Sequence, residues 1–220
     1  MLVCESCAVR VSDKFRDAER SIGERGVVQT GRLVAALPQV EHLESDCSSF
    51  LIEANRAIKS ISALPALFIT LPRVDSNFDH LRKHLADAVG QEEPITKFVE
   101  SAASEIRWLV EMRNLIEHPT QRKTVIKNFH VLPDGQISSP KWYLEGEAPE
   151  PIAEGMQSVV DFLIQVAENM IILLIMQSGK ERFTYKVQQI PDNEINRNFP
   201  IKYKLSAFFR SPPTGSSNAL

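Results

Sequence analysis

Cysteine is scarce in this 220-residue chain, which has only Cys4, Cys7 and Cys47. Three unevenly spaced cysteines cannot build the disulfide framework of a small secreted domain, so the composition indicates a reducing compartment. Cys4 and Cys7 have the C-x-x-C spacing of half a structural zinc site, but no second C-x-x-C pair or H-x-H cluster supplies the remaining ligands. We therefore expect no bound metal.

Long hydrophobic runs are also missing. The most apolar run, residues 170–176, has seven residues, whereas a helix needs about 20 to cross a bilayer. Near the N-terminus, charged residues precede any apolar segment long enough for a signal peptide. The sequence thus predicts a cytoplasmic protein with no membrane segment.

Positive charge is not in excess, because 25 Lys and Arg face 28 Asp and Glu, for a net charge of −3. The chain as a whole is therefore no general binder of polyanions, and any nucleic-acid contact must come from a local patch. No G-x-G-x-x-G, P-loop or G-x-S-x-G sequence occurs, so no cofactor is expected. His80 and His84 have a spacing that can bind metal, but Arg82 and Lys83 between them favour a solvated helix face.

What the sequence does have is helical periodicity. Apolar residues recur at intervals of three and four in four segments, which is typical of amphipathic helices. The segments run from Glu41 to Pro65, from a cap at Asp75 or Ser76 to Gly90, from Pro94 to His118, and from about residue 150 to Gly179. The fourth becomes apolar on all sides near its end, which we expect to be buried in the domain or in an interface.

The remaining segments read as smaller additions. Residues 1–40 suggest two short helices broken by Gly23 and Gly26, and alternating residues near 183–187 and 201–205 indicate strands. The predicted protein is mainly α. Its parts are an N-terminal helical extension (1–40), a bundle of four to five helices (41–178) with a β-hairpin insertion (about 124–144, turning at residues 132–135), a C-terminal β extension (179–210) and a disordered tail (211–220).

The third helix ends in the sequence EMRNLIEHPT. Arg113 follows Ile106 and Leu109 at spacings of seven and four, so it extends the apolar stripe. A guanidinium stays charged, so it must pair with an acid, cover surface with its stem, or meet an anion. Pro119 should end the helix and let His118 turn toward the side of Arg113.

The stretch behind this helix carries one sign of charge. Residues 118–133 contain no Asp or Glu but include Arg122, Lys123 and Lys127. This is the most one-sided basic stretch of an acidic chain, and it could attract phosphates. Arg122, Lys123 and Lys127 are therefore candidate phosphate-binding residues.

Structural roles compete with this interpretation. Arg113 and Glu117 are four residues apart and can form a surface ion pair, although in the less favourable order. His118 can simply cap the helix, and the basic stretch can be a solvated hairpin. Spacing alone slightly favours these roles over an anion site.

The hexapeptide RNLIEH, residues 113–118, resembles the R-x(4–6)-H motif of HEPN domains, in which a polar residue, often Asn, commonly follows the Arg. The order of segments is similar too: a long helix, a capped shorter one, a long helix ending in the motif, an insertion and a long closing helix. The resemblance covers about residues 41–178. It implies a bundle of four to five helices with the motif at the end of an inner helix.

For function, the resemblance implies metal-independent RNA cleavage, or a non-catalytic role in binding RNA or protein. Many members are toxins or defence proteins, and active ones dimerise so that two motifs face each other. On this basis His118 is the catalytic acid or base, Arg113 clamps phosphate oxygens, and Asn114 orients the histidine or a phosphate. On the same basis the RNA-binding residues are Arg122, Lys123 and Lys127. The expected partners are RNA, a second copy of the chain, and a possible antitoxin or partner protein. An unrelated helical interaction protein with a coincidental motif remains a third hypothesis.

Overall fold

The computed structural model describes residues 2–25, 28–30, 34–37, 39–72, 77–118, 122–195 and 201–209. Over these ranges the chain is mainly helical, as the periodicity predicts. The helices are α1 (Leu2–Arg25), α2 (Leu43–Ala63), α3 (Phe78–Val89), α4 (Pro94–Glu117) and α5 (Ile152–Gly179), with short 3-10 helices η1 (Leu64–Leu67) and η2 (Asp192–Glu194). The strands are β1 (Val28–Thr30), β2 (Val34–Ala36), β3 (Thr124–Lys127), β4 (His130–Val131), β5 (Ile137–Ser138), β6 (Lys141–Leu144), β7 (Glu150–Pro151), β8 (Phe183–Gln189) and β9 (Tyr203–Phe209).

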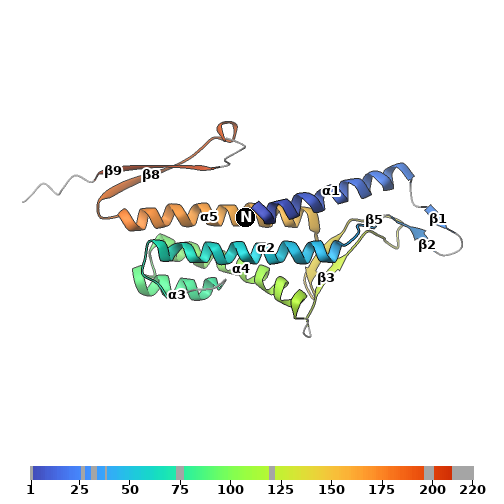
Figure 1. Ribbon diagram of the computed structural model, residues 1–220, viewed down its shortest axis with the longest axis horizontal. Helices are drawn as coiled ribbons and strands as arrows, with labels where there is room; N and C mark the ends of the chain where they lie inside the picture. The colour runs from blue at the N-terminus through green and yellow to red at the C-terminus, as the bar shows by residue number, and fades with distance from the viewer. Residues whose placement is uncertain are drawn as a thin grey trace, which may run out of the picture.

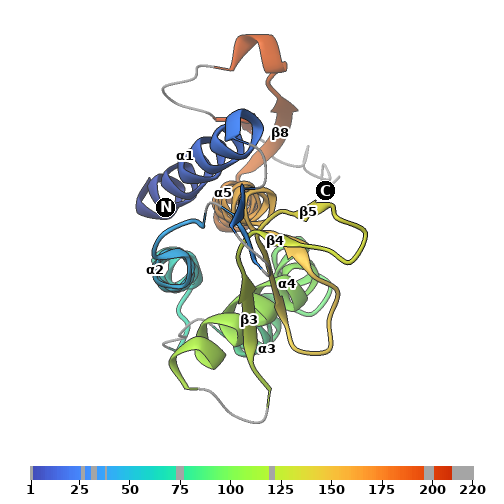
Figure 2. The ribbon, with the colours of Figure 1, turned by 90° about the vertical axis from the view of Figure 1, so that its right-hand side faces the viewer.

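The five helices share one hydrophobic core. In Figure 1 the long helices α1, α2, α4 and α5 run side by side, and Figure 2 looks along this bundle. The shorter α3 packs against α4. Each helix contributes fully buried side chains, among them Val11, Phe50, Leu81, Ile106 and Leu163. Burial of these apolar stripes is the main source of stability for such a bundle.

The N-terminal helix is part of the bundle and not an extension beside it. α1 runs unbroken through Gly23, so the first of the two short helices expected in residues 1–40 is part of one longer helix, and the expected break at Gly23 is wrong. Its buried face, which includes Cys4, Val11 and Phe15, packs on α2 and α5. This tertiary packing outweighs the helix propensity that Gly23 costs, about 1 kcal/mol.

A second helix in this region was also expected and is absent from the described residues. Val28–Thr30 and Val34–Ala36 instead form the antiparallel strands β1 and β2. Both segments contain Val, whose branched side chain favours extended backbone. Gly26, the other expected helix breaker, lies outside the described residues.

The boundaries of the central helices follow their sequence signals, with one correction. α3 is capped by Asn77, whose Oδ1 accepts a hydrogen bond from the backbone N–H of His80 at 3.1 Å. The expected caps, Asp75 and Ser76, lie outside the described residues. Gly90 ends α3 with a φ of 118°, a conformation that disfavours other residues.

The insertion after α4 is a small β unit that packs into the core. β3 pairs antiparallel with β6, and β6 also pairs with β7, so the unit continues past the expected end at residue 144. Its tip turns where expected: the N–H of Leu132 donates to the carbonyl of Gln136 at 2.7 Å, and Gly135 has a φ of 84°. Trp142 and Leu144 of β6 are fully buried, which anchors the unit on the bundle.

The expected C-terminal strands are present, and they pair with each other as a hairpin. β8 and β9 pair antiparallel from Phe183 opposite Phe209 to Gln189 opposite Tyr203. Figure 1 shows the hairpin along the C-terminal half of α5, where the N–H of Lys202 donates to the Glu168 carboxylate at 3.1 Å. The hairpin leaves Phe209 84% exposed. The expected disordered tail, residues 211–220, lies outside the described residues.

The apolar end of α5 is buried on one side. Met170 and Leu174 are fully buried, whereas Ile171 is 42% exposed, so the domain covers only one side of this end and burial of the other side in an interface stays a prediction. Over 28 residues α5 is long and apolar enough to cross a membrane by length and composition, although the core helix of a soluble protein meets the same criteria. The seven-residue run therefore underestimates the apolar length of this helix.

Candidate functional site

Arg113 lies at the edge of the buried face of α4, in its last turn. The fully buried stripe continues through Met112, and the Arg113 side chain is 26% exposed. The expected stripe is confirmed from Ile95 to Leu109, but its last buried position is Met112 and not Arg113. This position keeps the guanidinium at the surface, where its charge can be solvated or paired.

The guanidinium of Arg113 binds its own helix. Its Nη2 lies 2.6 Å from Oε2 of Glu117, and its Nη1 donates to Oδ1 of Asn114 at 3.0 Å. Its Nε is buried and has no hydrogen-bond partner among the described residues. The ion pair that competed with the anion hypothesis is thus present, while one buried donor remains unsatisfied.

His118 caps α4 with its backbone and exposes its side chain. The residue leaves helical geometry at φ −131° and ψ 73°, and its N–H donates to the Asn114 carbonyl at 2.7 Å. The imidazole makes no hydrogen bond within the described part of the chain and is exposed to solvent. Pro119, the expected cause of this break, lies outside the described residues.

Arg122 fastens the insertion to α4. Its Nη1 lies 2.8 Å from Glu111 on α4, its Nη2 lies 2.5 Å from Glu147, and its Nε donates to the Glu145 carbonyl at 3.1 Å. These contacts, first of all the hydrogen bond to Glu147, raise the pKa of Arg122 above its usual range. Arg122, a candidate RNA-binding residue, is therefore already bound to hydrogen-bond acceptors within the protein.

The two candidate lysines have different surroundings. Lys123 is exposed, and it lies just before β3. Lys127 is also exposed, and its ammonium lies 5.6 Å from the ring centre of Tyr143. The stretch that is basic in sequence thus acquires acidic neighbours in the fold, since Glu111 and Glu147 bind Arg122.

A chain of side-chain contacts that the sequence did not reveal joins α4 to the loop between β6 and β7. Trp108 Nε1 donates to Oε2 of Glu147 at 2.9 Å, while Oε1 of Glu147 binds Arg122. The indole of Trp108 also meets the buried ring of Trp142 edge-on, with centroids 6.4 Å apart. No local spacing signals these contacts, because 39 residues separate Trp108 from Glu147.

The cysteines are buried free thiols in the structure. Burial raises the pKa of Cys4 and of Cys47 to about 12. A metal binds the thiolate form, which burial disfavours at these two positions. Across the described residues, no group of three or more His, Cys, Asp or Glu is placed to hold a metal ion.

The arrangement at the end of α4 brings together a guanidinium, a carboxamide and, one turn later, an exposed imidazole. Such a set can bind an anion and move a proton, provided that the anion displaces Glu117. Comparison of the chain with known family profiles, with curated proteins and with solved structures finds no match in any of the three.

Proposed function

We propose that this chain is a metal-independent endoribonuclease of the HEPN type, acting in the cytoplasm as a homodimer and serving as a toxin or defence effector. The observation that carries the proposal is the exposed His118 at the C-terminal cap of α4, one turn beyond Arg113 and Asn114. This is the residue set of the R-x4-H motif, at the end of an inner helix.

The order of elements supports the proposal. α2, α3 and α4 are followed by the β insertion and then by α5, and α4 packs against α2, α3 and α5. These three helix contacts support the proposal that the motif ends an inner helix of the bundle. In Figure 1 the C-terminal hairpin lies at the other end of the bundle from the end of α4, so it leaves the motif uncovered.

The chemistry follows from the side chains. The His118 imidazole of one subunit takes the proton from the ribose 2′-OH, whose oxygen attacks the adjacent phosphorus. The bond from phosphorus to the 5′-oxygen breaks, and an imidazolium protonates that leaving oxygen. The products are a 2′,3′-cyclic phosphate and a 5′-OH end. A second copy of the chain provides the second His118, so that one histidine acts as base and the other as acid.

Arg113 stabilises the phosphorane that forms during the attack. Its planar donors can bind two phosphate oxygens, and charge that develops on those oxygens is stabilised best by donors already in place. Because Glu117 holds this guanidinium in the absence of RNA, the phosphate must replace the Glu117 carboxylate. Asn114 already accepts a hydrogen bond from Arg113, so it keeps the guanidinium oriented while the phosphate replaces the Glu117 carboxylate.

The Arg113–Glu117 ion pair also favours a second candidate function, a HEPN-like module that binds RNA or protein without cleaving RNA. A neutralised guanidinium is a weaker phosphate clamp, and Arg122 already binds two carboxylates. In this case Lys123 and Lys127 carry the contact with RNA.

RNA cleavage in EDTA separates the two candidates. The wild type is compared with Arg113→Ala and His118→Ala, and with two matched controls: His84→Ala on α3 and Arg20→Ala, whose guanidinium pairs with Asp17 within α1. We expect His118→Ala to lower the rate about 10²–10⁴-fold and Arg113→Ala about 10²–10³-fold, with both controls active. Products should carry 2′,3′-cyclic phosphates.

Two outcomes would count against cleavage by this site. Equal activity in all five proteins would rule out cleavage by this site. It would point to a contaminating nuclease, whose activity these substitutions do not affect. RNA binding without cleavage in the wild type would establish the second candidate. Expression in a host cell adds a test of toxicity, which should disappear in His118→Ala.

A further inference from the structure

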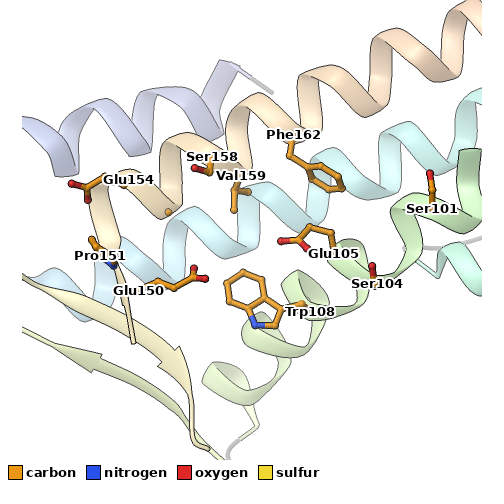
Figure 3. Close-up of a pocket in the computed structure, with 11 residues that line it drawn as sticks. Ser101, Ser104, Glu105, Trp108, Glu150, Pro151, Glu154, Ser158, Val159 and Phe162 are labelled. Atoms are coloured by element: carbon orange, nitrogen blue, oxygen red, sulfur yellow. The ribbon is translucent and has the colours of Figure 1, made fainter. Parts of the chain in front are cut away.

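A cavity of about 650 Å³ lies between α4 and α5, with β7 at one end (Figure 3). Its volume falls within the range of about 300–1,000 Å³ that is usual for small-molecule sites. α4 contributes Ser101, Glu105 and Trp108, while β7 and α5 contribute Glu150 and Glu154. None of these residues belongs to the candidate site at the end of α4.

The lining of this cavity is acidic. Glu105, Glu150 and Glu154 are exposed, and none of them forms an ion pair or a side-chain hydrogen bond with the described residues. The lining contains no Lys, Arg or His. Three like charges around one concave surface concentrate a negative potential there, which attracts cations and repels the phosphates of RNA.

An aromatic ring stands between two of these acids. Figure 3 shows Glu105 and Glu150 on either side of the Trp108 indole. The ring cannot turn freely, because its N–H donates to Glu147 at 2.9 Å and its plane meets Trp142 edge-on. A fixed aromatic ring flanked by carboxylates is suited to bind an organic cation, since the negative ring face and the acids act together.

The spread of the acids decides what kind of cation fits. The carboxylates are not grouped tightly enough to hold one metal ion. Among the described residues, no three His, Cys, Asp or Glu side chains lie close enough together for that. An extended cation can instead place one charge near each acid. Phe162 and Val159, also in the lining, offer apolar surface for the methylene groups between the charges.

We propose that this cavity binds an extended alkylammonium ligand, with one ammonium at Glu105 and Trp108 and others at Glu150 and Glu154. Two sources share this chemistry: a free linear polyamine, and lysine side chains in a flexible segment of a partner protein. The proposal does not depend on ribonuclease activity.

Titration calorimetry and tryptophan fluorescence test this site in the full chain. The probes are spermidine, a capped peptide of alternating Lys and Gly, and Mg²⁺ as a compact divalent cation. The test variant is the triple substitution Glu105→Gln, Glu150→Gln and Glu154→Gln. Its control neutralises three exposed acids elsewhere, Glu44→Gln, Asp87→Asn and Glu181→Gln, and so changes net charge equally.

We expect the wild type and the control triple to bind spermidine alike, and the test triple about tenfold or more weakly, from three exposed charge pairs. Trp108→Leu should weaken binding about two- to fivefold. Tighter binding of the peptide than of spermidine would identify a partner's lysines as the natural ligand, and the reverse order would identify a free polyamine. No spermidine binding to the wild type, equal loss in both triples, or equal binding of Mg²⁺ and spermidine would overturn the proposal.

Discussion

Arg113 and Glu117 form an ion pair across one turn of α4, with 2.6 Å between Nη2 and Oε2. Both side chains are partly shielded, at 26% and 29% exposure. Arg followed four residues later by Glu is the weaker of the two possible orders in a helix. Glu117 therefore contributes little to helix stability while it occupies the guanidinium that a phosphate would need.

Removing the charge of Glu117 should release this guanidinium. We expect Glu117→Gln to raise affinity for a labelled single-stranded RNA about two- to fivefold, the equivalent of one partly exposed ion pair. Fluorescence anisotropy at fixed salt measures the effect. Asp17→Asn on α1, which breaks a longer and more exposed helical ion pair with Arg20, serves as the control for lost negative charge and should change nothing. If both variants bind RNA like the wild type, Arg113 does not contact phosphate.

The three cations of the basic stretch should behave differently. Lys123→Ala with Lys127→Ala removes two exposed charges, so the slope of log K against log salt for single-stranded RNA should fall by about 1.4. Arg122→Gln should leave this slope almost unchanged, because its guanidinium binds Glu111 and Glu147. A slope that falls equally in the Arg122 variant would show that RNA displaces these carboxylates.

Arg122→Gln should instead loosen the insertion. The loss of the contacts to Glu111 and Glu147 should lower the urea midpoint at low salt, and this difference should shrink at 1 M salt, where charges are screened within about 3 Å. An unchanged midpoint at low salt would mean that the strand pairing and the buried Trp142 hold the insertion without this clamp.

Substitution of glycine by alanine should change the free energy of unfolding in opposite directions at two positions. A Cβ on Gly155 would lie 2.8 Å from Nε1 of the buried Trp142, so Gly155→Ala should lower the free energy of unfolding by about 1–2 kcal/mol. Gly23 in α1 has no atom within 4 Å of its Cβ position, so Gly23→Ala should raise it by about 0.5–1 kcal/mol. Urea denaturation checks both. A stabilised Gly155→Ala would show that the indole moves aside without cost.

The helices show what local pattern can reveal. The apolar spacing, Pro94 and Gly90 located α3 and α4 closely, because helix ends depend on nearby residues. The sequence predicted only a short helix in the region of α1, because the buried face of α1 depends on packing against α2 and α5 and Gly23 suggested a break that this packing overrides.

The candidate site divides in the same way. The Arg113–Glu117 pair and the cap at His118 are local, and their possibility was visible in the spacing. The acceptors of Arg122 were not, because Glu147 lies 25 residues away and reaches Arg122 only when β3 pairs with β6. Counting charges along the chain cannot reveal a carboxylate brought in by strand pairing.

The cysteines should make stability depend on pH in the alkaline range. Burial raises the pKa of Cys4 and Cys47 from 9.0 to about 12, so both hold their proton more tightly in the folded state. Their contribution is complete below pH 9 and is lost as pH rises from 9 towards 12. Urea midpoints measured from pH 8 to 11 should fall, and a Cys4→Ala, Cys47→Ala double variant should show a flatter profile.

The contact between α1 and α5 joins the first and the last helix of the chain. More than 120 residues separate them, so the part of α1 that faces α5 stays uncovered until α5 has been synthesised. A ribosome-bound chain that ends before residue 152 leaves the α5-facing side of α1 exposed to solvent and to chaperones. The contact between α1 and α5 therefore forms late in synthesis, and it completes the core of the bundle.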